Sequence, residues 1–401
     1  MLLNINMDTL QEFFGIEKQD FDYDESKKKL IDNLDFLKSM SVQEQTFYKK
    51  WKEVQSLEKY MDKSIIVKNK IWTPSDLNDE KKTIKEIEDI NPTVVYVKNK
   101  TSLDTDWIML RTYVHTMAYD QTPGRFIKIL ITDGNKDNPR YLGAISMSSD
   151  VITITDRDNY IGWTADQKLK NKKLNNSAIG SCIMATQPFG YNFLGGKLVA
   201  ALVTGETIRN LWKDLYGQVL AGITTTSLYG SYSMYNSLKW WHKCGTSAGK
   251  MTIKPDDDVY KIWHDWIKEN KADKYIQAMT QKEGVSGPVT GAKNRVLSMI
   301  FSQCGIKSSN YVHGFERGTY YACPYTNSRE FLRGEIEESK LNPNTKYTEE
   351  YIKNWWKEKA ISRYKTLKND NRLKPEILYY NKMMGMSYED CKNMYFGEVG
   401  R

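Results

Sequence analysis

Cysteine is scarce in this sequence, and its spacing excludes two common roles. The chain of 401 residues has five cysteines, Cys182, Cys244, Cys304, Cys323 and Cys391, which lie far apart and include no CxxC pair. An odd number of scattered cysteines fits neither a disulfide framework nor a metal knuckle. We therefore expect reduced thiols and a cytoplasmic location.

Long hydrophobic runs are also missing. No apolar stretch reaches the roughly 18 residues of a membrane-spanning helix, and the first residues lack the basic start and apolar run of a secretory signal. The sequence thus predicts a protein that is neither secreted nor inserted in a membrane. Hydrophobic residues still make up 40% of the chain and aromatic residues 12%, which is enough for a folded core.

Length and charge suggest several parts and a modest basic excess. A chain of 401 residues exceeds what one compact core usually holds. Its 58 Lys and Arg against 50 Asp and Glu give a net charge of +8, which is informative only where it clusters. We expect a helical N-terminal region (1–90), an α/β core (91–260), an α+β extension (261–340) and a basic helical C-terminal region (341–401).

Hydrophobic periodicity predicts the first elements. Residues 26–60 repeat apolar side chains at helical spacing, which is typical of an antiparallel helix pair. A strand at 93–97, a helix at 107–119 and a hairpin of strands 126–132 and 141–147 follow.

The most site-like stretch is residues 177–250. The continuous apolar run 178–185 predicts a buried strand, and a helical segment then extends to about residue 217. The next strand, 219–226, should run parallel to the first by the right-handed crossover rule. A short helix is expected at 234–241, after a loop at the end of that strand, where open α/β sheets bind their ligands.

A glycine turn between strand and helix is a candidate phosphate site. Asn192 is a plausible N-cap, and Gly195 and Gly196 would lie in the first helical turn, where free N–H groups attract anions. The alternative is that these glycines only permit close helix packing. The candidate cofactor-binding residues are Gln187, Gly190, Asn192, Gly195 and Gly196.

Tyrosines dominate the loop after the second strand. Tyr229, Tyr232 and Tyr235 are the acid–base candidates there, in place of the usual histidine or carboxylate.

Two basic segments are candidate nucleic-acid contacts. Residues 166–174 have no apolar face and read either as a solvated loop or as a phosphate-backbone contact through Lys168, Lys170, Lys172 and Lys173. Residues 351–374 combine eight Lys or Arg and two acids with aromatic side chains, a pattern shared by DNA-contacting and solvated helices. The candidates in this helix are Lys353, Trp356, Lys357 and Arg363.

In the C-terminal third we expect helices at 265–275 and 293–301. One further segment there allows two interpretations. Residues 311–321 alternate around two glycines. A structural hairpin is one interpretation. The other is a second wall of the substrate pocket, with Arg317 on a phosphate.

The order of elements over residues 94–250 resembles the GNAT acyltransferase superfamily. Tyr235-Asn-Ser-Leu-Lys-Trp240, followed by Cys244-Gly-Thr-Ser-Ala-Gly249, resembles a signature of the DruA family of Druantia anti-phage systems and is similar to a stretch of the phage DNA-modification protein Mom. The resemblance implies an α/β fold with a GNAT-like mixed sheet core and helical N- and C-terminal extensions. One departure is that Thr224, Thr225 and Thr226 stand where these relatives carry an aspartate.

The function implied by these likenesses is group transfer to an exocyclic amine of a DNA base. The likeness to Mom implies that this amine is N6 of adenine. Acetyl-CoA or another acyl-type donor would be the cofactor, double-stranded DNA the partner and Tyr235 a proton donor or orienting group. The likeness to Mom also suggests iron as a possible cofactor, with His115 as a candidate ligand. A histidine packed in the core is the simpler interpretation, so we commit to no metal site. A non-catalytic DruA-like DNA-binding protein and an acyltransferase for a protein or small amine remain as alternatives.

Overall fold

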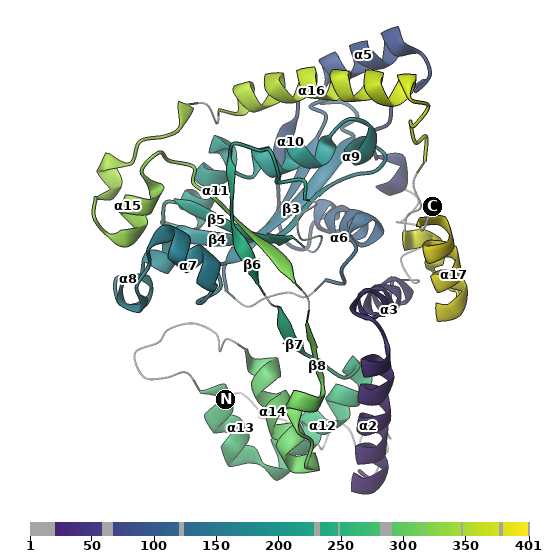
Figure 1. The fold of residues 1–401 in the computed structure, drawn as a ribbon, viewed down its shortest axis with the longest axis vertical. Helices are drawn as coiled ribbons and strands as arrows, with labels where there is room; N and C mark the ends of the chain where they lie inside the picture. Colours follow the sequence, from purple (N-terminus) through teal and green to yellow (C-terminus); the bar gives the residue numbers. More distant parts are fainter. Residues whose placement is uncertain are drawn as a thin grey trace, which may run out of the picture. The chain divides into compact units, whose positions relative to one another are not determined.

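The structure is a computed structural model of the chain, shown in Figure 1. It describes residues 21–57, 67–119, 124–227, 233–247, 249–280, 291–314, 316–345, 348–376 and 380–399. The chain divides into two compact units, one made of Met1–Ser41 and Lys250–His313, the other of Val42–Gly249 and Gly314–Arg401. These boundaries differ from the four segments that composition suggested, because the smaller unit joins an N-terminal segment to one from the middle of the chain.

A seven-stranded mixed sheet forms the centre of the larger unit. Its order is β1 (Thr93–Val97), β2 (Phe126–Thr132), β3 (Tyr141–Ser149), β4 (Ser177–Ala185), β5 (Gly222–Ser227), β9 (Arg317–Ala322) and β6 (Trp241–Ser247). Strands β4 and β5 are parallel, as the crossover rule predicts, and every other neighbouring pair is antiparallel. The expected α/β class with a mixed sheet is therefore confirmed.

Helices and short 3-10 turns accompany this sheet. They are α3 (Val42–Gln55), α5 (Glu80–Asp89), α6 (Ser102–Val114), α7 (Thr155–Ile161), α8 (Ala165–Leu169), η2 (Lys173–Asn176), α9 (Phe189–Asn192), α10 (Gly195–Leu202), α11 (Glu206–Tyr216), α15 (Ser328–Arg333), η4 (Glu338–Lys340), α16 (Glu349–Asn369), η6 (Tyr380–Met383) and α17 (Tyr388–Val399). The N- and C-terminal helical segments agree with the predicted extensions.

The sheet buries both faces because its strands are apolar on both sides. On β2, Ile127, Ile129 and Ile131 join the core beneath α10, whereas Leu130 points to the opposite core, which contains α6. Helix α16 lies over α10 and beside α5 (Figure 1). Its Trp356 side chain packs in the core beneath α10.

The smaller unit is mainly helical. It contains α2 (Tyr23–Ser39), α12 (Asp257–Asn270), α13 (Ala272–Met279), α14 (Ala292–Cys304) and η3 (Ser308–Asn310), with β7 (Lys250–Thr252) paired to β8 (Val312–Gly314). Trp263 is fully buried and packs edge-on against Tyr23, whose hydroxyl donates to the carbonyl of Gln303 at 2.8 Å. The two helices expected in residues 26–60 exist, but they belong to different units.

Several predicted elements are wrong in type or extent. The helix expected at 107–119 runs from Ser102 to Val114, since its first turn is polar and does not show in the apolar pattern. The basic loop at 166–174 contains α8, which a capping box of Thr164 and Gln167 starts, and part of η2. The segment up to residue 217 is two helices, interrupted near Gly205.

Two errors share one cause, the insertion of β9 into the sheet. The short helix expected at 234–241 is absent: Ser237 has a left-handed φ of 63°, and β6 begins at Trp241. The hairpin expected at 311–321 does not form either, because β8 pairs with β7 and β9 lies between β5 and β6. Partners so distant in sequence leave no local signal.

No helix among the described residues has both the length and the apolar character required to cross a bilayer.

Candidate functional site

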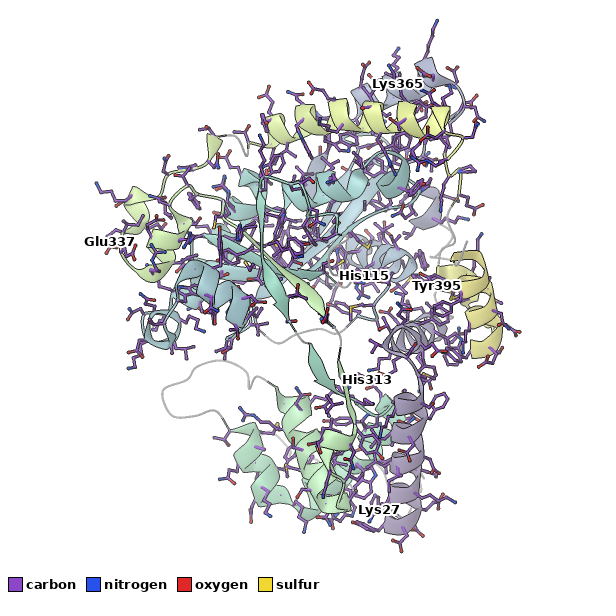
Figure 2. The ribbon with its side chains drawn as sticks, viewed as in Figure 1. Lys27, His115, His313, Glu337, Lys365 and Tyr395 are labelled. Atoms are coloured by element: carbon purple, nitrogen blue, oxygen red, sulfur yellow. The ribbon has the colours of Figure 1, made fainter. Side chains whose placement is uncertain are left out.

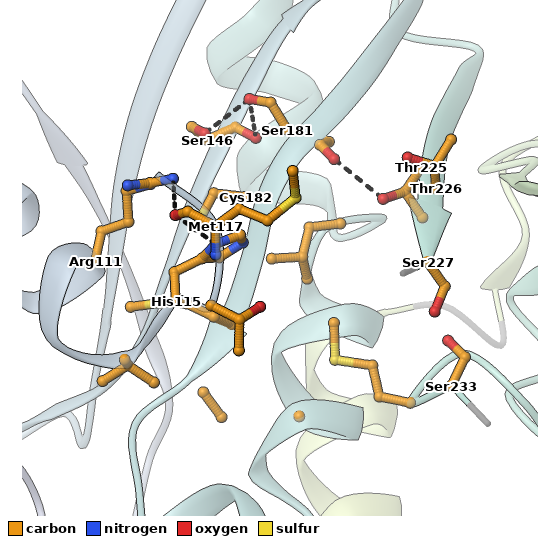
Figure 3. Close-up of a pocket in the computed structure, with 18 of the residues that line it drawn as sticks. Arg111, His115, Met117, Ser146, Ser181, Cys182, Thr225, Thr226, Ser227 and Ser233 are labelled. Carbon is orange, nitrogen blue, oxygen red and sulfur yellow. Dashed lines mark hydrogen bonds between the residues drawn. The ribbon is translucent and has the colours of Figure 1, made fainter. Parts of the chain in front are cut away.

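A cavity of about 550 Å³ opens where β4 and β5 separate (Figure 3). The two strands pair only from Ser177 to Ile179 on β4 and from Gly222 to Thr224 on β5. Beyond these residues, the rest of β4, the end of β5, the segment after α6 and the first turn of α10 line the cavity. The carboxyl ends of parallel strands are where open α/β sheets hold ligands, so this is the candidate site.

The cavity wall is rich in neutral hydroxyl groups. Ser146 and Ser181 hydroxyls lie 2.8 Å apart, and the Thr225 hydroxyl donates to the carbonyl of Gly180 at 3.0 Å. Among the described residues that line the cavity, none is an aspartate or a glutamate. Hydroxyls, an imidazole, a thiol and two guanidinium groups therefore define its chemistry.

His115 follows α6 and contributes a neutral imidazole. The backbone N–H of Met117 donates to Nδ1 of His115 at 3.1 Å, while the Met117 carbonyl, 3.3 Å from the same nitrogen, accepts from Arg111. We therefore assign the ring proton to Nε2. Burial, with Arg111 and Lys50 nearby, lowers the pKa of His115 to about 3. The ring is thus a hydrogen-bond donor at neutral pH and a weak base.

An ion cluster that the sequence did not suggest lies behind His115. Glu53 accepts from Lys50 at 2.6 Å, from Arg111 at 2.9 Å and from the backbone N–H of Tyr119 at 2.8 Å. Lys50 is fully buried. The sequence contains a signal for this burial, because Phe47, Lys50 and Val54 fall at i, i+3 and i+7, on the apolar stripe of α3.

Tyr235 is the one candidate tyrosine within the described residues. It is buried, its ring lies against Trp241 and Tyr320, and its hydroxyl is 3.5 Å from that of Thr225. Burial raises the pKa of Tyr235, so its phenol stays protonated at neutral pH. Tyr229 and Tyr232 fall outside the described residues.

The glycine turn only partly matches its predicted role. Gln187, Gly190 and Gly196 line the cavity, and α10 begins at Gly195. A Cβ on Gly195 would lie 2.2 Å from the Phe189 ring, so this glycine permits close packing.

Asn192 is not the N-cap that the sequence suggested. It lies in α9, and its side chain bonds both the N–H and the carbonyl of Lys374, while Leu194 precedes α10 with a left-handed φ of 54°.

The first basic segment presents less charge than expected. Lys168 is buried, and its ammonium donates to Asp158 at 2.5 Å. Lys170 is exposed and pairs with Asp166 at 3.0 Å, and Lys173 lies over the Phe331 ring at 3.8 Å. Lys172 is exposed, in a left-handed conformation before η2.

The second basic segment, α16, is anchored by several of the candidates. Trp356 is fully buried and donates to the carbonyl of Phe193 at 2.9 Å, so it offers no stacking surface in this conformation. Lys353 donates to Asn91, Lys357 to the carbonyl of Glu88, and Arg363 to that of Tyr191. The exposed cations of α16 are instead Lys359 and Lys365, and the carboxylates of Glu350 and Glu358 are exposed as well.

A buried charge network lies behind the paired ends of β4 and β5. Asp150 accepts from Arg157 at 2.7 Å, from Ser177 at 2.5 Å and from Thr224 at 2.7 Å. Arg157 also pairs with Asp158 at 2.6 Å. These polar groups are satisfied by one another and do not line the cavity.

For metals, the described part of the chain shows no grouping of three or more His, Cys, Asp or Glu side chains.

The fold and cavity define an α/β protein with a ligand-sized site at the carboxyl ends of a parallel strand pair. The particular family follows from sequence comparison: the chain belongs to the DruA family, whose model, described as Druantia protein DruA, matches residues 43–334. That span includes every residue that lines the cavity. Helices α16 and α17 lie outside it.

One curated relative is Druantia protein DruA of Escherichia coli (strain UMEA 4076-1), 24% identical over 264 residues. The match covers 61% of this chain and 62% of that protein, so it spans less than two thirds of the relative's length. No solved structure matches the chain. The resemblance to DruA is thus confirmed, while the likenesses to GNAT enzymes and Mom stay predictions.

Proposed function

We propose that this protein acts in a Druantia-type anti-phage system as a DNA-binding component whose cavity receives a nucleotide. The observation that carries the proposal is the cavity itself: its volume of about 550 Å³ lies in the range of small-ligand sites. Membership of the DruA family supports the defence context.

The cavity wall combines a mostly apolar surface with polar groups that could bind the edges of a base. Hydroxyls of Ser181, Thr225 and Thr226 can donate to or accept from the edges of a base, and Arg317 adds a cation. A base reaches such a pocket only from a single strand or after leaving the stack. The proposal therefore includes unstacking of the target nucleotide.

The proton chemistry favours binding over catalysis. The pKa of His115 is lowered to about 3, the pKa of Tyr235 is raised, and no carboxylate is among the described lining residues. General acid–base catalysis works best with a group whose pKa lies near the ambient pH. The described residues thus support a non-catalytic DruA-like role as the first candidate.

Base modification remains the second candidate, supported by the placement of Gly196 and Tyr235 in one cavity. An acyl-type donor such as acetyl-CoA would lie near the first turn of α10, with the exocyclic amine of adenine near Tyr235. Tyr235 would then hold the amine through its hydroxyl.

DNA binding is the direct test. Fluorescence anisotropy with a labelled duplex and a labelled single strand, over a salt series, should show affinity that falls steeply as salt rises. Absence of binding to both at low salt would contradict the proposal.

Mass spectrometry of nucleosides separates the two candidates. DNA from cells that express the protein should contain only ordinary nucleosides if the role is binding. A new nucleoside that disappears with Tyr235→Phe would establish modification instead.

A further inference from the structure

We infer that the end of the cavity formed by Arg111 and His115 binds an anionic group, the phosphate of a nucleotide ligand. Arg111 lines the cavity, is only 4% exposed, and its Nε–H has no hydrogen-bond partner among the described residues. A buried cation that lacks part of its hydrogen bonding is costly, and an anion in the cavity that Arg111 lines would stabilise its charge.

The other nitrogens of Arg111 hold its guanidinium in place. Nη1 donates to Glu53 at 2.9 Å and Nη2 to the carbonyl of Met117 at 2.9 Å. The Tyr119 ring lies 4.9 Å from Cζ. These two bonds use two of the five N–H groups of the guanidinium and hold it in place before any ligand arrives, which lowers the entropic cost of binding.

The charge balance around this end also calls for an anion. Lys50 and Arg111 are two buried cations that share one carboxylate, that of Glu53. Burial, with Arg111 nearby, lowers the pKa of Lys50 to about 8. A phosphate within reach would offset the remaining positive charge.

His115 supplies a second donor at the same end. Its Nε2 carries the proton because Nδ1 accepts from Met117. Figure 3 shows Arg111, His115 and Met117 together on one side of the cavity, with Thr225, Ser227 and Ser233 across from them. The cavity thus has an end with Arg111 and His115 for an anion, and across from it a hydroxyl-rich wall beside Arg317 for the base.

This assignment moves the phosphate away from the glycine turn to which the sequence pointed. It rests on the proposed function for the choice of a nucleotide as ligand. Binding of a phosphate beside Arg111 can nevertheless be measured without any DNA, so the two proposals fail separately.

Titration calorimetry of the full chain with dAMP, deoxyadenosine and inorganic phosphate tests the site. We expect dAMP to bind at least tenfold more tightly than deoxyadenosine. Arg111→Gln should weaken the affinity for dAMP by about tenfold to a hundredfold, which corresponds to the loss of a hydrogen bond to a charged group. The affinity for deoxyadenosine should not change. The control is Arg372→Gln, which removes an exposed cation paired with Asp370.

The inference is overturned if dAMP and deoxyadenosine bind equally, if none of the probes binds, or if Arg111→Gln leaves dAMP affinity intact. A short single-stranded oligonucleotide tests whether the site also binds a phosphate of a polymer. Arg111→Gln should weaken oligonucleotide binding by the same factor as dAMP binding. If dAMP binds through Arg111 but no DNA binds, the anion site stands and the proposed DNA function fails.

A measurement on the unaltered protein covers the case in which Arg111→Gln does not fold. Calorimetry of dAMP at pH 8, in two buffers of different ionisation enthalpy, reports proton uptake. Lys50 does not line the cavity, but it shares Glu53 with Arg111, so a phosphate beside Arg111 should raise the pKa of Lys50. Binding should then take up a fraction of a proton. Zero uptake would count against the site as firmly as an unaffected variant.

Discussion

The hydroxyl of Thr224 donates a 2.7 Å hydrogen bond to the carboxylate of Asp150. Thr224 lies in β5, and its partner carboxylate comes from the residue that follows β3. Because Arg157 and Ser177 also bond Asp150, this acid joins β3, β4 and β5 at their buried ends. Its role in the described structure is to stabilise the sheet beside the cavity.

Asp150→Asn should therefore lower stability. The change breaks a fully buried ion pair, which typically costs about 3–5 kcal/mol. Urea unfolding followed by circular dichroism would measure the loss. The matched control is Asp166→Asn, which removes an exposed pair with Lys170 and should cost less than about 1 kcal/mol. Equal losses for the two variants would show that the buried network is not a stabilising element.

Gly195 and Gly196 should respond differently to alanine. A Cβ at Gly195 would meet the buried Phe189 ring at 2.2 Å, so Gly195→Ala should cost about 1–3 kcal/mol by overpacking. A Cβ at Gly196 would meet the flexible end of Met234 at 3.2 Å, so Gly196→Ala should change stability little. If the phosphate lies at the Arg111 end, Gly196→Ala should also retain dAMP affinity. A selective loss of dAMP affinity in Gly196→Ala would return the phosphate to the glycine turn.

Burial of His115 should make the free energy of unfolding fall at acidic pH. Its pKa in the folded protein is about 3, below its value of 6.5 in the unfolded chain, so the unfolded state binds more protons between these pH values. The resulting stability is complete above pH 6.5 and is lost as the pH falls toward 3. Between pH 7 and 4.5, the native chain should lose roughly 2 kcal/mol more than His115→Gln. Unfolding free energies at the two pH values measure this, and parallel losses would contradict it.

Lys359 and Lys365 should contribute to DNA affinity through charge alone. Both are exposed on α16, and Figure 2 shows Lys365 on the outer side of that helix, near α5. Replacing both with glutamate should weaken duplex binding at low salt and reduce the slope of log affinity against log salt by about 2. The control, Lys29→Glu, alters an exposed lysine of α2 paired with Glu25. An unchanged slope would place the DNA surface elsewhere.

Local patterns predicted much of the sheet. The strand at Thr93–Val97 and the hairpin strands beginning at Phe126 and Tyr141 follow from β-branched and apolar residues in short runs. The parallel pairing of β4 and β5, and a site at their ends, follow from general chain topology. These features depend on residues close together in sequence or on rules that hold for most folds.

The rest depends on distant partners. Strand β6 contains Cys244 and Gly245 and lacks a run of β-branched residues, so only its pairing with β9 makes it a strand. The anion site similarly depends on Arg111 meeting Glu53 from a helix 58 residues earlier. Sequence reasoning placed the candidate site at the strand ends where the cavity lies, and it named glycines and tyrosines there. It did not find Lys50, Glu53 and Arg111, because only tertiary structure brings them together.

The position of β9 between β5 and β6 has a consequence for how the chain folds during synthesis. Strand β6 pairs in the sheet only with β9, which emerges after the intervening residues of the smaller unit, Lys250–His313. Until then the nascent chain carries two unpaired strand edges, a state that favours misassociation. The second segment of the smaller unit is thus made within an interruption of the larger one, and the cavity end near Arg317 is the last part of the site to be translated. A truncated product that stops before residue 317 would lack both the closing strand and that arginine.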